Sequence, residues 1–218
     1  QSFGAYGEDQ YNVEATTLYN NIPTEFRIIA NMDEGNFETI ELIEGISIDN
    51  INPTTPDDLS GSHNDNNILL TWSYEHDIDF NYHQINDIYN ETLYSTENEI
   101  TFIQEEIYNE HTVQSVDANN NFSDQSNHVS IHHLHDGYNL IGVNVLSQDP
   151  TVGTVLESLG ENVDNIITET NASTQILPGT WVGGLSEINH LNGYWVNLDL
   201  DIEDKLIISG QKGVCQDM

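Results

Sequence analysis

The chain has 218 residues, and its 37 acidic side chains face only three basic ones, which gives a formal net charge of −34. Binding to nucleic-acid phosphates or to an anionic membrane depends on clustered Lys and Arg. Three scattered cations therefore exclude both kinds of partner. Apolar residues make up 37% of the chain, enough to build a core, unlike an acidic disordered segment.

Residues 1–50 are expected to form an N-terminal β segment or arm. Apolar and polar residues alternate between Phe26 and Ala30, and a second β-branched stretch runs from Phe37 to Ile48. The polar cluster between these stretches indicates a hairpin turn in which Gly35 supplies a positive φ. Residues 1–25 are interpreted as an arm that could add a strand to a neighbour's sheet edge.

Residues 52–134 are predicted to form a β-sandwich. Pro53 and Pro56 open this segment, and the stretch Asn67–Ser73 places alternate apolar side chains on one face. Further short strands follow at FNYHQIN, NEITFI, HTVQSVD and the segment that ends in NHVSI. Short strands at this spacing, separated by turn residues, are typical of a sandwich.

This segment resembles a fibronectin type III domain of the bacterial secreted kind. His111 stands where the family usually has Tyr, and Asn120 replaces a Gly, although Asn tolerates left-handed backbone geometry. The matching residues are Pro56, Trp72, Asp77, Asp79, Phe80, Tyr82, Val113, Ser115, Val116, Asp117, Asn121 and Ser123.

Residues 135–210 are predicted to form a small α+β domain, followed by a tail at 211–218 that contains the only cysteine, Cys215. A strand at 137–145 is followed by a helix from Pro150 to Leu159, capped by Asp149 and ended by Gly160. Its apolar residues recur at i, i+3, i+4 and i+7, as in an amphipathic helix.

The third segment resembles a small domain of modular secreted proteins of marine bacteria and of marine phage structural proteins. The motifs that carry this resemblance are Gly137–Ile141, the helix, Trp181–Ile188 and Gly193–Trp195. The resemblance implies an architecture and a location rather than a chemistry.

The best candidate site is a calcium site at one pole of the sandwich, where the loop after the Trp strand should meet the last hairpin loop. Carboxylate and amide oxygens are the ligands that calcium prefers. The same residue types also make turns through hydrogen bonds to their own backbone. The candidates are Asp77, Asp79, Asp117, Asn119, Asn121 and Asp124.

Two other constellations suggest binding. His133 and His135 would share one strand face, where they could hold zinc or copper with Asp136, or simply belong to an exposed polar strand. Trp181, Tyr194 and Trp195 could form an aromatic platform for sugars, or belong to the core. Tyr194 and Trp195 must point to opposite faces if both lie in one strand.

The sequence is interpreted as a mainly β, non-catalytic protein on the outside of a cell or virion. It has no nucleophile elbow, HExxH motif or phosphate loop. Assembly or adhesion is the expected role, as a filament, fibre or decoration component, with copies of itself, other surface proteins or glycans as partners. The alternatives are a carbohydrate-binding accessory region and, third, an enzyme. Calcium is the one cofactor that the pattern suggests.

Overall fold

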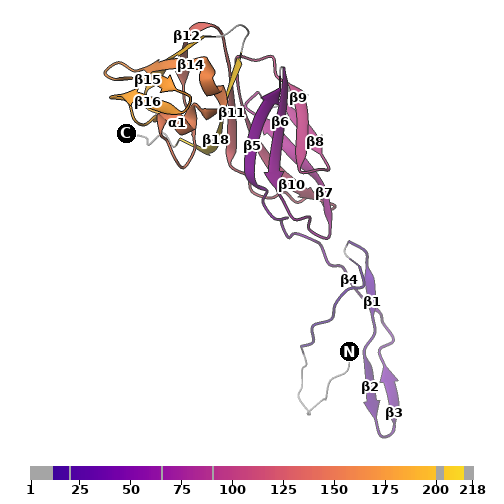
Figure 1. The fold of residues 1–218 in the computed structure, drawn as a ribbon. Helices are drawn as coiled ribbons and strands as arrows, with labels where there is room; N and C mark the ends of the chain where they lie inside the picture. Colours follow the sequence, from indigo (N-terminus) through magenta and orange to yellow (C-terminus); the bar gives the residue numbers. More distant parts are fainter. Residues whose placement is uncertain (1–11, 20, 65, 90, 200–203, 214–218) are drawn as a thin grey trace. The chain divides into compact units, whose positions relative to one another are not determined.

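The computed structural model describes residues 12–19, 21–64, 66–89, 91–199 and 204–213, which are mainly β (Figure 1). The chain divides into two compact units, Gln1–Ile51 and Asn52–Met218. Cys215, most of the predicted tail and the first eleven residues of the predicted arm lie outside the described residues. Among the described helices, none has the length and apolar character to cross a membrane.

The first unit contains two short antiparallel strand pairs. β1 (Thr24–Phe26) pairs with β4 (Ile43–Gly45), and β2 (Ile29–Met32) pairs with β3 (Gly35–Glu38). The predicted hairpin is confirmed, because β2 turns directly into β3 and Gly35 has a φ of +133°. A residue with a Cβ would be strained at this backbone angle, so the turn needs its glycine.

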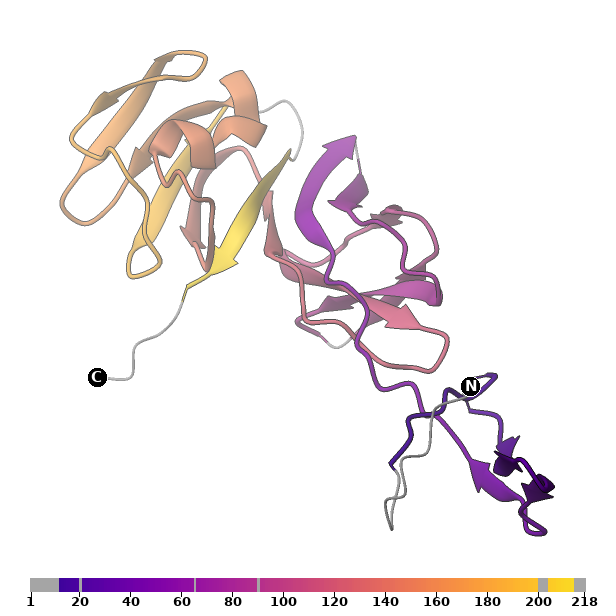
Figure 2. The same cartoon turned by 90° about the horizontal axis from the view of Figure 1, so that it is seen from below.

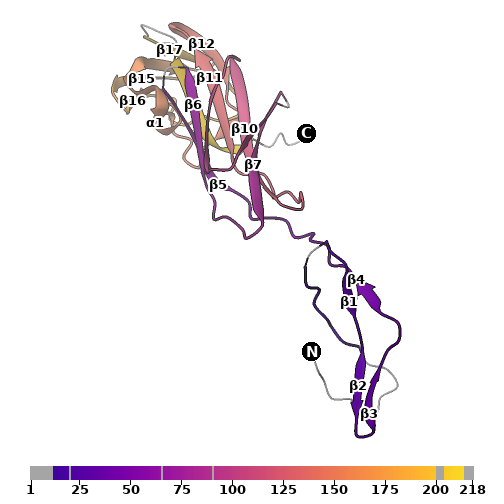
Figure 3. The same cartoon turned by 90° about the vertical axis from the view of Figure 1, so that its right-hand side faces the viewer.

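Seven antiparallel strands form the sandwich of the second unit. One sheet has the order β5-β6-β9, and β11-β10-β7-β8 run through the other, where β7 and β10 lie side by side (Figure 3). This division resembles that of immunoglobulin-like sandwiches and agrees with the predicted fibronectin type III-like fold. The strands are β5 (Asp57–Asn64), β6 (Asn67–Ser73), β7 (Phe80–Asp87), β8 (Thr92–Ser95), β9 (Glu99–Ile103), β10 (Tyr108–Asp117) and β11 (His128–Leu134).

The sandwich core follows from the alternation of side chains along its strands. In β6, Ile68, Leu70 and Trp72 are buried on one face, as the sequence pattern predicts. They pack with Ile85 of β7 and Val113 of β10 across the gap between the sheets. Burying each large aliphatic side chain contributes about 1.5–3 kcal/mol, which holds the two sheets together without ion pairs.

The C-terminal part of this unit contains a separate five-stranded antiparallel sheet with the order β12-β17-β14-β15-β16. Its own core includes Val152, Val155, Leu156 and Leu159, which form the predicted apolar stripe. The strands of this part are β12 (Gly137–Gly142), β13 (Val145–Leu146), β14 (Val163–Ile167), β15 (Ala172–Leu177), β16 (Thr180–Gly183), β17 (Gly193–Leu198) and β18 (Asp204–Lys212).

The predicted single helix is shorter than expected and is divided in two. α1 (Val152–Val155) is one turn, and a 3-10 segment, η1 (Glu157–Asn162), follows it. These segments lie against β14, β16 and β18 (Figure 2). The Asp149 carboxylate accepts the backbone N–H of Thr151, so it stabilises the turn before the helix rather than capping a ten-residue helix.

The two parts of the second unit share a sheet. β18 pairs with β11 of the sandwich along seven residues and with β13 on its other side (Figure 1). The resulting six-stranded sheet has the order β13-β18-β11-β10-β7-β8. The predicted boundary between residues 134 and 135 therefore falls inside one compact unit, and the division into separate domains stays a prediction.

Candidate functional sites

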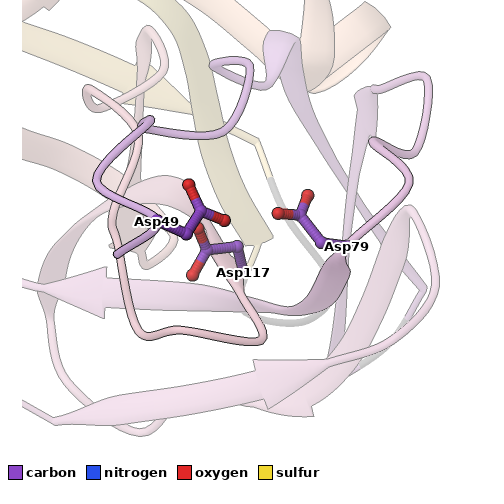
Figure 4. A group of neighbouring side chains, drawn as sticks. All are labelled: Asp49, Asp79 and Asp117. Carbon is purple, nitrogen blue, oxygen red and sulfur yellow. The ribbon is translucent and has the colours of Figure 1, made fainter. Parts of the chain in front are cut away.

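The predicted pole of the sandwich brings the loops after β6 and β10 together. The backbone N–H of Ala118 donates to the carbonyl of Asp79 at 2.8 Å. Figure 4 shows the Asp79 and Asp117 side chains, whose carboxylate oxygens lie within 4.8 Å of each other. Two of the four carboxylates among the calcium candidates are therefore neighbours.

Asp117 organises the loop that follows β10. Its Oδ1 accepts the backbone N–H groups of Asn119 and Asn121 at 2.8 Å each, and its Oδ2 accepts the Asn121 side-chain amide at 2.7 Å. Burial alone would raise the pKa of Asp117, but these hydrogen bonds lower it below the ordinary value. Asn120 takes the left-handed conformation predicted for it, with a φ of +64°. This geometry stabilises a turn whether or not a cation is present.

The other two carboxylates among the calcium candidates lie apart from this pair. Asp77 accepts the backbone N–H of Thr54 at 2.7 Å, the Thr54 hydroxyl at 3.1 Å and the Tyr74 hydroxyl at 3.0 Å. The Thr54 backbone hydrogen bond is the largest cause of the lowered pKa of Asp77. Asp124 is exposed. Asp77 thus ties the entry of the sandwich to the loop after β6.

The histidines between residues 128 and 135 have different surroundings, with His133 half-buried on β11 and His135 exposed after it. His132 is buried against Tyr108, with the ring centroids 4.7 Å apart, and burial lowers its pKa to about 4. His128 Nδ1 lies 2.7 Å from the Glu110 carboxylate. His135 Nδ1 contacts the backbone carbonyl of Asp136 at 2.6 Å. Among the described residues, these side chains do not converge as three metal ligands.

The three aromatic candidates take different positions. Tyr194 is fully buried and bonds through its hydroxyl to the backbone of Asn189, so it belongs to the core and cannot stack on a sugar. Trp181 is half-buried against the same core. Trp195 is 46% exposed on the opposite face of β17 from Tyr194, as the strand geometry requires.

Trp195 belongs to an outward face of the five-stranded sheet. Leu140 of β12 and Ile167 of β14 stand opposite Trp195 in the strand register. Tyr138 and Leu140 are exposed on the same strand as the buried Ile141. The sequence signal for this face is that both sides of β12 carry large apolar side chains, which the prediction of a strand at 137–145 did not take into account.

A cavity of about 300 Å³ opens between the two sheets of the sandwich, beside β9. The sequence did not point to this cavity, because its carboxylates are indistinguishable from the many others in so acidic a chain. Its lining residues are Ile85, Asp87, Glu91, Leu93, Phe102, Ile103, Gln104, Glu105, Glu106, Asn109 and His111.

No protein-family model matches the chain, and no curated protein matches it. Among solved structures, it is similar to the crystal structure of the FN1–FN3 domains of chicken CNTN1, with 12% identity and a TM-score of 0.30. The match covers 89% of this chain and 80% of that one. The description of residues 52–134 as fibronectin type III-like rests on their strand order.

Proposed function

We propose that this chain is a non-catalytic assembly or adhesion protein that works outside the cell or on a virion, and that its N-terminal unit docks on a partner. One observation carries the proposal: the N-terminal unit folds into strands, but residues 12–19 and 21–51 bury almost none of their apolar side chains. The resemblance of residues 135–210 to a domain of secreted and phage structural proteins supports the same location.

Among the described residues of the N-terminal unit, only Thr24 is buried. Soluble monomers rarely expose contiguous apolar surface larger than a few hundred Å². Isolated two-stranded ribbons are marginally stable in water, and their free edges can accept another strand. The exposed large apolar side chains of this unit are Val13, Leu18, Tyr19, Ile22, Ile28, Ile29, Met32, Phe37, Ile40, Leu42, Ile43, Ile46, Ile48 and Ile51.

The second unit supports a non-catalytic role. A Ser–His pair exists in the sandwich, where Ser115 Oγ lies 3.4 Å from His83 Nδ1. Both side chains are fully buried among β7 and β10, so a substrate cannot reach the hydroxyl. This pair is explained by packing, and it also satisfies a polar group inside the core.

The assembly role predicts that a new charge on the exposed apolar surface of the N-terminal unit abolishes association. Phe37→Asp should convert oligomers of the full chain into monomers, because an aspartate cannot be buried against an apolar partner surface. Light scattering coupled to size exclusion, at physiological and at high salt, measures this. High salt is needed because repulsion between chains of charge −34 opposes association. Leu191→Asp, on an exposed residue of the second unit, is the matched control. A monomeric wild-type chain under both conditions would contradict self-assembly.

Glycan binding is the second candidate, and the exposed face of Tyr138, Leu140 and Trp195 favours it. Aromatic rings on a flat sheet can stack on sugar rings, and the Asn197 amide on the same sheet can donate hydrogen bonds. Glycan-array binding that is lost in Trp195→Ala but retained in Tyr94→Ala would support it. Tyr94 is a comparably exposed aromatic residue of the sandwich. Equal loss in both variants would argue against this face.

A further inference from the structure

The cavity beside β9 combines an acidic rim with an apolar floor. The floor is formed by Ile85, Leu93 and Phe102, from strands of both sheets. Four carboxylates line the same space, from Asp87, Glu91, Glu105 and Glu106. Among the described residues, neither Glu105 nor Glu106 forms an ion pair. The rim therefore concentrates negative charge that the chain leaves without a cation.

Two hydrogen bonds determine how the polar groups of the cavity are oriented. The Gln104 amide donates to the carbonyl of Glu106 at 3.3 Å, which turns its Oε1 toward His111 Nε2 at 3.5 Å. Because Oε1 can only accept, Nε2 carries the imidazole proton. His111 Nδ1 then presents a lone pair, and it has no hydrogen-bond partner although His111 is buried. This nitrogen is closed to solvent, so the cavity offers a ligand its carboxylates and its apolar floor.

The cation for this rim cannot come from the chain itself. Arg27 binds Glu38 at 2.8 Å, and Lys212 binds Glu110 at 2.7 Å. Lys205, the third and last basic residue, is buried in β18. A second copy of the chain would bring the same three cations in the same contacts. A cation that binds at this rim would therefore come from a different molecule.

We propose that this cavity binds an organic cation, an ammonium or guanidinium group carried on a short aliphatic chain. The aliphatic part contacts the apolar floor, and the charged group lies among the four carboxylates. The volume is at the lower end of the range for small-ligand sites, about 300–1,000 Å³. A bare metal ion fits less well, because among the described residues no three ligand atoms of this cavity converge.

The test must separate a site from general attraction to a polyanion. Titrations of the full chain at physiological salt, followed by ¹⁵N–¹H chemical shifts, use pentylammonium, with potassium and 1-pentanol as the charge-only and apolar-only probes. The expected result is saturable binding of pentylammonium, with shifts confined to residues of the cavity. Shifts spread over the surface, or equal responses to potassium, would overturn the proposal.

A pair of double variants provides the control. Glu105→Gln/Glu106→Gln should weaken pentylammonium binding about tenfold, because the variant removes two of the negative charges nearest the ligand. Glu97→Gln/Glu99→Gln removes the same charge from exposed positions of the neighbouring hairpin, outside the cavity. It should leave affinity within twofold. Equal weakening by both pairs would show a diffuse ion atmosphere and would falsify the site.

A second series of titrations identifies the source of the cation. An N-acetylated, C-amidated peptide with one central lysine is titrated beside the free amine. Binding of both, each weakened in Glu105→Gln/Glu106→Gln, assigns the cavity to the basic side chain of a partner protein. Binding of the amine alone assigns it to a free small molecule. Failure of both probes to bind overturns the proposal, and it leaves the arm-dependent assembly untouched.

Discussion

Individual acidic residues in this chain have structural partners, and Glu110 shows how much one of the few cations can matter. Its carboxylate is almost fully buried between His128 and Lys212, and it also accepts the Tyr108 hydroxyl at 3.2 Å. Burial raises the pKa of Glu110, but the Lys212 ammonium and the other partners lower it overall. One of only three basic residues is thus committed to a buried carboxylate.

Lys212→Met should lower the free energy of unfolding by about 1–3 kcal/mol, because it removes the ammonium group and leaves the buried Glu110 carboxylate with only His128 and the Tyr108 hydroxyl as partners. Urea denaturation at neutral pH measures the loss. Arg27→Met removes an exposed ion pair and should cost less than about 0.5 kcal/mol. Equal losses in the two variants would mean that Lys212 acts only through the net charge of the chain.

Asp117→Ala should cost about 1–3 kcal/mol, because two backbone N–H groups and one amide lose their acceptor. Asp124→Ala, at an exposed position of the same loop, should change stability little.

We also expect low-millimolar calcium to raise the melting temperature no more than sodium chloride of equal ionic strength. A calcium-specific rise that disappears in Asp117→Ala would instead support the calcium site predicted from the sequence.

At the scale of elements, the sequence predicts the strands in which apolar and polar side chains alternate, because their apolar faces build a core. It misses the strands that contribute few side chains to a core. β6 has the predicted bounds, and β17 contains the predicted motif Gly193–Trp195, because each strand places three apolar residues on one face. β5 has the sequence DDLSGSHN, with Leu59 as its one buried apolar residue, and β8 has no buried residue. These strands form because backbone hydrogen bonds complete the sheets, and a hydrophobic pattern cannot predict that.

The pairing of β18 with two partners also lies beyond local pattern. This pairing depends on the register between strands that are far apart in the sequence. At Gly210, the backbone of β18 comes very close to the backbone of β13. A Cβ built at Gly210 would lie 1.8 Å from the backbone oxygen of Leu146 in β13. Other long-range pairings, of β7 with β8 and β10 and of β17 with β12 and β14, bring together the residues of the acidic cavity and of the outward aromatic face.

Gly210→Ala should therefore separate β13 from β18 and cost about 1–3 kcal/mol, since backbone has to move to relieve the overlap. Gly142→Ala is the matched control, because a Cβ at that strand position would meet no atom within 4 Å. Thermal unfolding compares their stabilities, and amide exchange of Val145 and Leu146 reports the pairing locally. Unchanged protection of these amides in Gly210→Ala would contradict the expected separation.

For the whole molecule, the net charge of −34 makes burial rather than ion pairing the source of stability. Four ion-pair contacts are formed among the described residues, and two of them converge on Glu110. Three histidines, His83, His111 and His132, are buried in the second unit. Desolvation is the largest cause that lowers the pKa of each to about 4. These groups make stability depend on pH.

The sign of this dependence follows from proton binding. An unfolded histidine has a pKa near 6.5, so between that value and about 4 the unfolded chain binds more protons than the folded one. Burial of the neutral imidazoles contributes fully to the free energy of unfolding above pH 6.5, and this contribution is lost as the pH falls. Each buried histidine should lower the free energy of unfolding by about 2 kcal/mol by pH 5, before most carboxylates are protonated.

His132→Leu should flatten the decline in unfolding free energy between pH 7 and 5 by about 2 kcal/mol, since one of the three titrating groups is removed. The slope is compared rather than the absolute stability, because the substitution also changes packing against Tyr108. His190→Gln, at an exposed position, controls for the loss of a histidine. Denaturant titrations at several pH values measure the slope. An unchanged slope in His132→Leu would show that carboxylates, whose protonation relieves the repulsion within this polyanion, dominate the acid response instead.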